Sequence, residues 1–208
     1  MDQPLTIPAW ARQTDQAFKA TYPLGPRPST IMLNRVLARS LVPLLNQFPT
    51  DQQLRDKPLL LELGLPLPPK LRFYIFTATQ HESERQVDTY RVQLTAGLQV
   101  STSRYAFSRE DGIRPVLLGF EPRLGVFIIW DADVNDANGG FPFSQGVQSP
   151  PELVYRAAAN GIAEGERTAR RAATRELIIA ARADKLVVGL LRRIDYSNRA
   201  LTERANVG

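Results

Sequence analysis

Three acidic residues at the ends of two apolar segments are the strongest candidates for chemistry in this sequence. Asp131 and Asp133 follow the apolar run VFIIW, and Glu121 ends the preceding segment RPVLLGFE. If residues 126–133 form a strand, its alternation places both aspartates on the same side. Grouped carboxylates can hold Mg²⁺ and serve a metal-dependent nuclease. Asp131 and Asp133 are therefore candidate metal ligands, and Glu121 would complete the catalytic set of such a nuclease.

A purely structural role competes with this interpretation. Asp131 and Asp133 could instead accept hydrogen bonds from turn amides or cap the segment that follows. The restriction-nuclease pattern of an acid followed by Asp/Glu-x-Lys is missing, because none of the four lysines lies two residues after an acid on an expected strand. The structural role is therefore favoured, and Mg²⁺ is expected as a cofactor only under the nuclease alternative.

Several other classes of chemistry are disfavoured by composition. The chain has no cysteine and one histidine, His81, which lies in a charged segment expected to be a loop. A thiolate zinc site and a cysteine nucleophile are excluded, and a Ser-His-Asp triad is not indicated. No Gly-rich phosphate-binding loop occurs, which argues against nucleotide hydrolysis.

Arginines and amide side chains form a second set of candidates, suited to DNA. Arginine binds phosphate and guanine in a bidentate manner, asparagine and glutamine can read adenine edges, and an aromatic ring can stack on a base. The alternative is a solvated sheet face with ordinary cross-strand charge pairs, and for the tryptophan a place in the core. The candidate DNA-binding residues are Arg72, Arg91, Arg104, Arg109, Arg114, Trp130, Asn138, Ser144, Gln145, Gln148, Arg167, Arg170 and Arg171.

The proposed role of the last three of these arginines depends on whether they lie on a helix. If the helix expected after Pro151 continues through residues 164–173, Arg167, Arg170 and Arg171 lie on one face of it. That face would be either a phosphate-binding stripe or a solvated helix surface.

The overall charge permits nucleic-acid binding without demanding it. The net charge is +5 at a pI of about 9.8, with 22 arginines against 4 lysines. Arginine suits phosphate contacts, although a GC-rich genome with its arginine codons explains the same bias. No run of 18 apolar residues and no signal peptide is present, so we expect no membrane span and a cytoplasmic location.

The elements that must position these residues predict an α+β fold. β-Branched and aromatic residues, alternation and turn residues define a central antiparallel sheet over about residues 71–132, with a further strand near 175–181. Closely spaced strands of this kind favour a strongly curved sheet or a partly open barrel, packed with N- and C-terminal helices. The expected strands are 72–79, 89–96, 100–107, 114–121 and 126–133, followed by a long loop at 134–151.

The chain is expected to divide into a helical N-terminal extension, residues 1–69, and an α+β core, residues 70–208, which together form one compact unit. Residues 30–47 carry apolar side chains at helical spacing, with a kink expected at Pro43. Such a stripe usually packs in the core. The alternative is that it binds a second copy of the chain or a partner protein.

The order of segments resembles a known family. RFYIFTAT is followed by DTYRVQL, VLLGFEP, GVFIIWDADVN, FPFSQGVQ, PPELVYRAAANGIAEGER and ELIIAARADKLVVGLL. This order is similar to the specificity modules that accompany bacterial restriction and methylase systems, over about residues 70–195. In those modules an R-[IV]-Q-[IL] strand and a [FW]-x-x-W-D strand precede a serine-containing loop and two helices.

The resemblance implies recognition of double-stranded DNA, by sequence or by modification, within prokaryotic defence. The first hypothesis is therefore a DNA-binding component of a restriction or related defence system. A divergent Mg²⁺-dependent endonuclease is the second hypothesis. The third is a scaffold or assembly subunit, held by the 30–47 helix.

Overall fold

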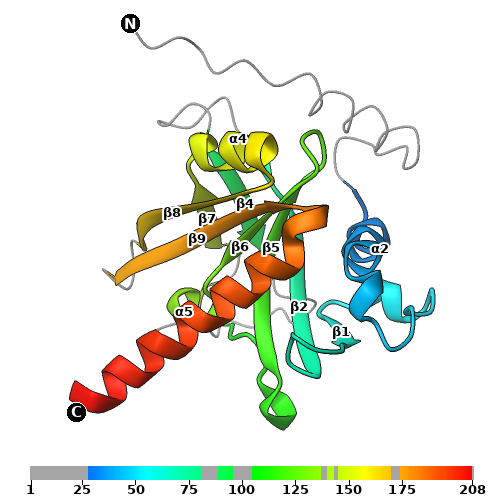
Figure 1. Ribbon diagram of the computed structural model, residues 1–208, viewed down its shortest axis with the longest axis horizontal. Coiled ribbons are helices and arrows are strands. Elements are labelled where there is room, and N and C mark those ends of the chain that lie inside the picture. The colour runs from blue at the N-terminus through cyan, green and yellow to red at the C-terminus, as the bar shows by residue number, and fades with distance from the viewer. Residues whose placement is uncertain are drawn as a thin grey trace, which may run out of the picture.

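The computed structural model describes residues 28–80, 89–95, 105–136, 140–142, 145–169 and 174–207. The predicted α+β class is confirmed: two sheets pack together with helices on both sides (Figure 1), and neither sheet closes into a barrel. No helix in these ranges is long and apolar enough to cross a membrane. Residues 1–27, the charged segment with His81, and residues 100–104 of the expected strand 100–107 lie outside the described ranges.

A six-stranded sheet forms the centre of the fold. Its strand order is β1-β2-β5-β6-β9-β8, and all neighbours are antiparallel except β2 and β5. The parallel pair departs from the expected antiparallel sheet, because the chain leaves the large sheet after β2 and returns to it at β5 in the same direction. The strands are β1 Leu59–Glu62, β2 Lys70–Thr77, β5 Arg114–Glu121, β6 Val126–Trp130, β8 Ile162–Ala169 and β9 Thr174–Arg182.

A three-stranded sheet draws two of its strands from the excursion between β2 and β5 and the third from the segment after β6. It consists of β3 Thr79–Gln80, β4 Tyr90–Leu94 and β7 Gln145–Ser149, all antiparallel. The alternation predicted for β4 is confirmed, since its first, third and fifth residues are buried. The prediction of one long loop over 134–151 is wrong at both ends: the short helix α3 Ala132–Asn135 opens this segment, and β7 lies near its end.

The helices and the small sheet cover the two faces of the large sheet. On one face, the three-stranded sheet and α4 Pro151–Asn160 enclose a core that includes Trp130, Val92 and Leu153. On the other face, α2 Thr30–Ser40 and α5 Leu186–Val207 pack on Phe73, Leu118 and other apolar residues. The molecule therefore has three layers, with the large sheet in the middle (Figure 1).

The apolar stripe predicted for residues 30–47 faces this second core. Leu33, Val36, Leu37 and Leu41 are buried against the sheet of the same chain. The α-helix ends at Ser40, and Pro43 lies in a short 3₁₀ turn, Val42–Leu44. Core packing therefore accounts for the stripe, while β1 of the proposed extension pairs with β2 of the proposed core. The division of the chain at residue 70 stays a prediction.

The helix that begins at Pro151 is shorter than the sequence suggested. It ends at Asn160, where Gly161 takes a left-handed backbone conformation with φ 88°. Residues 162–169 then form strand β8, so the predicted helical face carrying Arg167, Arg170 and Arg171 is wrong. The charged sequence EGERTA has little strand character of its own, and pairing with the apolar strand β9 decides its conformation.

The two sheets approach each other closely at Gly119. A Cβ atom at this position would lie 2.8 Å from two ring atoms of Trp130 and 2.8 Å from Cγ1 of Val92. The indole ring of Trp130 therefore occupies the space of the missing side chain.

We expect Gly119→Ala to lower the free energy of unfolding by about 1–3 kcal/mol, because the added methyl group overpacks this contact. Urea denaturation measures the change. Gly64→Ala is the matched control, because its Cβ would meet only Leu44 O at 3.6 Å. Equal denaturation midpoints for the two variants would contradict the close packing of Trp130 and Val92 around Gly119.

Candidate functional site

Asp131 begins the helix α3 instead of continuing the strand. Strand β6 ends at Trp130, and Oδ1 of Asp131 accepts hydrogen bonds from the main-chain N–H groups of Asp133 (2.8 Å) and Val134 (3.3 Å). The expectation that both aspartates lie on one side of a strand is therefore wrong, because the chain turns after Trp130. The capping role considered for Asp131 is confirmed.

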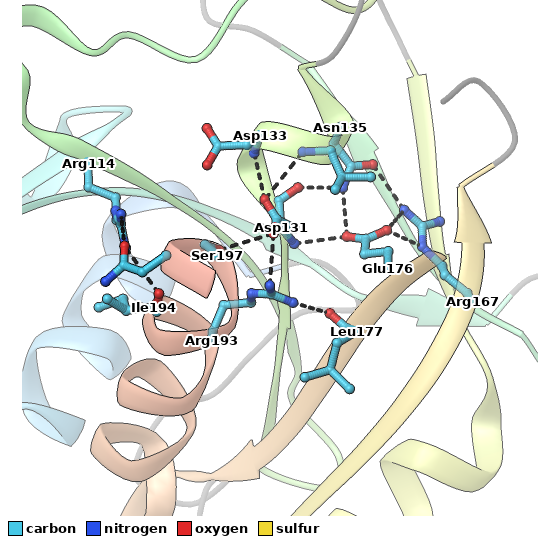
Figure 2. Close-up of polar contacts among 12 residues, drawn as sticks. Arg114, Asp131, Asp133, Asn135, Arg167, Glu176, Leu177, Arg193, Ile194 and Ser197 are labelled. Carbon is cyan, nitrogen blue, oxygen red and sulfur yellow. Dashed lines mark hydrogen bonds and ion pairs between the residues drawn. The ribbon is translucent and has the colours of Figure 1, made fainter. Parts of the chain in front are cut away.

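The second carboxylate oxygen of Asp131 anchors the C-terminal helix. Oδ2 accepts hydrogen bonds from Nη2 of Arg193 (2.8 Å) and from Oγ of Ser197 (3.0 Å), both on α5. Nη1 of Arg193 also donates to the carbonyl of Leu177 on β9 (2.5 Å). The side chains of Asp131, Arg193 and Ser197 are buried, so one carboxylate joins the end of β6 to α3 and α5 (Figure 2).

Glu176 extends the network to the edge strand. Its Oε1 accepts from the main-chain N–H of Asp131 and from Nδ2 of Asn135, both at 2.8 Å. Its Oε2 accepts from Nε of Arg167 at 2.6 Å, and Nη2 of Arg167 reaches Oδ1 of Asn135 at 3.0 Å. Burial of Glu176 raises its pKa above the ordinary value, and the guanidinium of Arg167 offsets only part of that rise.

Glu121 does not join the aspartates. It pairs with Val126, at the start of β6, whereas Asp131 follows the last residue of that strand. At about 3.4 Å per residue, five residues place Glu121 about 17 Å from Asp131. Glu121 is buried and pairs with Nε of Arg123 at 2.8 Å.

No group of three or more His, Cys, Asp or Glu side chains that could hold a metal ion occurs among the residues that the structure describes. The acids considered for a nuclease thus take part in two separate sets of ion pairs and hydrogen bonds. Asp131 bonds Arg193 and Asp133 bonds Arg109, while Glu121 bonds Arg123.

Several of the predicted DNA-binding arginines make internal contacts. Arg109 bridges Asp133 (2.6 Å) and Asp136 (2.5 Å). The buried Arg72 donates to Oγ of Ser108 at 2.5 Å.

Arg114 and Arg167 are engaged in the same way. Arg114 donates to Oδ1 of Asn198 on α5 at 2.5 Å, and Arg167 belongs to the Glu176 network. These contacts hold elements of the fold together and leave fewer guanidinium groups facing outward than the sequence suggested.

Two further candidates face inward. Trp130 is 1% exposed, and its indole N–H donates to the carbonyl of Gln148 at 3.1 Å. Gln145 is paired with Leu94 in the inward row of the small sheet, and its buried Oε1 has no hydrogen-bond partner among the described atoms. Arg104, Asn138, Ser144, Arg170 and Arg171 lie outside the described residues.

The outward face of the three-stranded sheet brings two of the candidates together. Arg91 on β4 lies directly opposite Gln148 on β7, and Gln93 follows Arg91 on the same side of β4. Gly146 lies opposite Gln93, and a Cβ there would lie only 2.4 Å from Nε of Arg91. The side chain of Arg91 therefore lies across Gly146, on a polar surface that the buried face of the sheet supports.

The network residues on β9 and α5 were not anticipated from the sequence, although signals for them exist. Glu176 is the one acid within the apolar segment LIIAA and its flank, where a solvated residue is unexpected. Arg193 and Ser197 continue the spacing of the apolar stripe that includes Leu186 and Leu190. A polar residue on a core-facing stripe needs a buried hydrogen-bonding partner. The sequence alone does not identify that partner.

Comparison with known protein families identifies the family to which the chain belongs. Residues 69–188, more than half of the chain, match the model of a protein family described as Methylase-associated X1. This range holds β2 through the first residues of α5, and with them Asp131, Glu176, Arg91 and Gln148. Neither a curated protein nor a solved structure matches the chain.

We expect Asp131→Ala to lower the free energy of unfolding by about 3–5 kcal/mol, because Arg193 would remain buried without its partner. Chemical denaturation followed by tryptophan fluorescence measures the loss. Asp133→Ala removes a carboxylate that is 35% exposed, and the same assay should show a loss below about 1 kcal/mol. Similar losses for both variants would contradict the anchoring role of Asp131.

The raised pKa of Glu176 predicts a pH dependence. Because the folded state holds this proton more tightly than the unfolded state, Glu176 makes the free energy of unfolding fall as the pH rises from the ordinary value of 4.5 through the raised value. Gln at position 176 does not titrate. Denaturation at stepped pH should therefore show wild type losing stability relative to Glu176→Gln over this window. A constant difference would contradict the assignment.

Proposed function

Because the chain belongs to the Methylase-associated X1 family, we propose that it is the DNA-binding component of a methylase-associated restriction or related defence system. The observation that carries the proposal is the outward row of Arg91, Gln93 and Gln148 on the three-stranded sheet. The sheet would lie against double-stranded DNA with this face.

The side chains of the row suit base edges. Arginine pairs with guanine O6 and N7, and glutamine pairs with adenine N6 and N7, each through two hydrogen bonds. Arg91 and Gln93 are two residues apart on one strand, which is about 7 Å. This distance is close to two base steps at about 3.4 Å each. Strands that enter the major groove present side chains in this way.

The geometry also explains the glycine in the row. Gly146 leaves room for the guanidinium of Arg91 to lie across β7. A side chain at position 146 would push Arg91 away from that place without disturbing the buried face. The positive net charge of the chain adds a sequence-independent attraction for phosphate.

We expect Arg91→Ala to weaken duplex binding by about tenfold, the loss of one bidentate base contact. Gly146→Ala should weaken it as well while leaving the thermal midpoint unchanged, because only the arginine must move. Fluorescence anisotropy with labelled duplexes, methylated and unmodified, over a salt series measures both effects.

The matched control is Arg175→Ala. This variant removes the same charge from a side chain that is 85% exposed and belongs to β9 of the large sheet. It should bind like wild type, and all affinities should fall steeply with salt. Absence of binding to every duplex at low salt, or an equal loss for Arg91→Ala and Arg175→Ala, would overturn the proposal.

A further inference from the structure

An open groove lies beside the buried network. Its volume is about 800 Å³. The walls come from α5, from strands β8 and β9, and from the start of α3. The paired residues Asp131, Glu176 and Arg193 form the floor.

The wall formed by α5 is apolar and exposed. Tyr196 is 39% exposed and Leu201 is 46% exposed, and both line the groove together with Ala200. This part of α5 extends past the strands of the large sheet (Figure 1), so no other described element covers it. Tyrosine is enriched at surfaces that bind other proteins, and the neighbouring leucine adds apolar area to this wall.

The rim of the groove is acidic, in contrast to the basic chain as a whole. Five carboxylates but only two guanidinium groups line the groove as a whole, and of these acids Glu166 and Glu203 are exposed. Asp131, Glu176 and Asp133 are each held by an arginine at 2.5–2.8 Å. Glu166 has only Arg175, at 3.6 Å and with both side chains largely exposed, and no ion pair of Glu203 occurs among the described residues.

We propose that this groove binds a cationic amphipathic helix of a partner protein. One apolar side chain of that helix would pack between Tyr196 and Leu201, and flanking Arg or Lys residues would meet Glu166 and Glu203. Short amphipathic helices bind grooves in this way, with apolar anchors one turn apart. The groove volume of about 800 Å³ admits a few such anchors.

Two other occupants fit less well. A nucleic acid would bring phosphates to the carboxylates of Glu166 and Glu203, which repel them. A second copy of this chain, related by a twofold axis, would bring each acidic rim against the other. The inference does not depend on DNA binding, since the residues involved differ from Arg91, Gln93 and Gln148.

The test uses the full chain and two synthetic probes. One is a fluorescein-labelled helical peptide of about four turns with leucines at i, i+4 spacing flanked by arginines. The other is its twin with glutamates in place of the arginines. Anisotropy titrations compare wild type, Leu201→Asp, the double variant Glu166→Arg/Glu203→Arg, and the control Leu65→Asp, whose side chain is 90% exposed in the turn after β1. Sedimentation of each protein alone accompanies the titrations.

The cationic peptide should bind wild type and Leu65→Asp equally, at least tenfold more tightly than it binds Leu201→Asp. The double charge variant should lose this peptide and gain affinity for the acidic twin. Equal binding of both peptides to wild type, no effect of Leu201→Asp, or a wild-type dimer that Leu201→Asp dissociates would each overturn the proposal. The DNA affinity of Leu201→Asp stays unchanged in either case, so this result is independent of the proposed function.

Discussion

The buried carboxylate of Asp131 is the interaction on which the arrangement of the α5 side of the fold depends. A charge removed from water must find compensating partners, and here it finds two amides of α3 together with Arg193 and Ser197 of α5. Glu176 in turn accepts a hydrogen bond from the main-chain N–H of Asp131, and Arg167 donates a hydrogen bond to the carboxylate of Glu176. The two acids thus determine where β6 ends, where α3 begins and how α5 is positioned along the sheet. A long helix on an apolar surface can slide by a turn at little cost, whereas a helix tied to a buried charge cannot.

A second constraint fixes the small sheet. The ring of Trp130 fills the space above Gly119, and its N–H group donates to the carbonyl of Gln148 on β7. The inward row of the small sheet, with Val92 and Val147, packs into the same core. Because alternate residues of a strand point to opposite faces, this buried row determines which residues face outward. The position of Arg91 is therefore set by core packing, although Arg91 itself lies on the surface. Strand β6 ends at Trp130, so the core residue Trp130 and the buried carboxylate of Asp131 are adjacent in the chain.

Local sequence was sufficient for the elements that carry their own pattern and insufficient for the rest. Strand 114–121 was predictable from its continuous apolar run, and β4 from its apolar residues at every second position. Strand β7, with QGVQS, has a single large apolar residue and depends on pairing with β4. Strand β8 was mistaken for a helix because its charged residues favour helix locally, and its neighbour β9 overrides them. The parallel pairing of β2 with β5 and the partners of Asp131 join residues far apart in the chain, which no local pattern encodes.

The separation of charge over the molecule bears on how its two proposed surfaces would work together. Arg91 and the glutamines lie on the outer layer formed by the small sheet, whereas the groove opens between α5 and strands β8 and β9. Under the two proposals, phosphate would be attracted to the first surface and repelled by the second, whereas a cationic helix would be attracted to the second. The two proposed ligands would then not compete for one site, and a single copy of the chain could hold both. Such an arrangement would keep a partner protein beside bound DNA and raise its effective concentration there without any contact between the two sites.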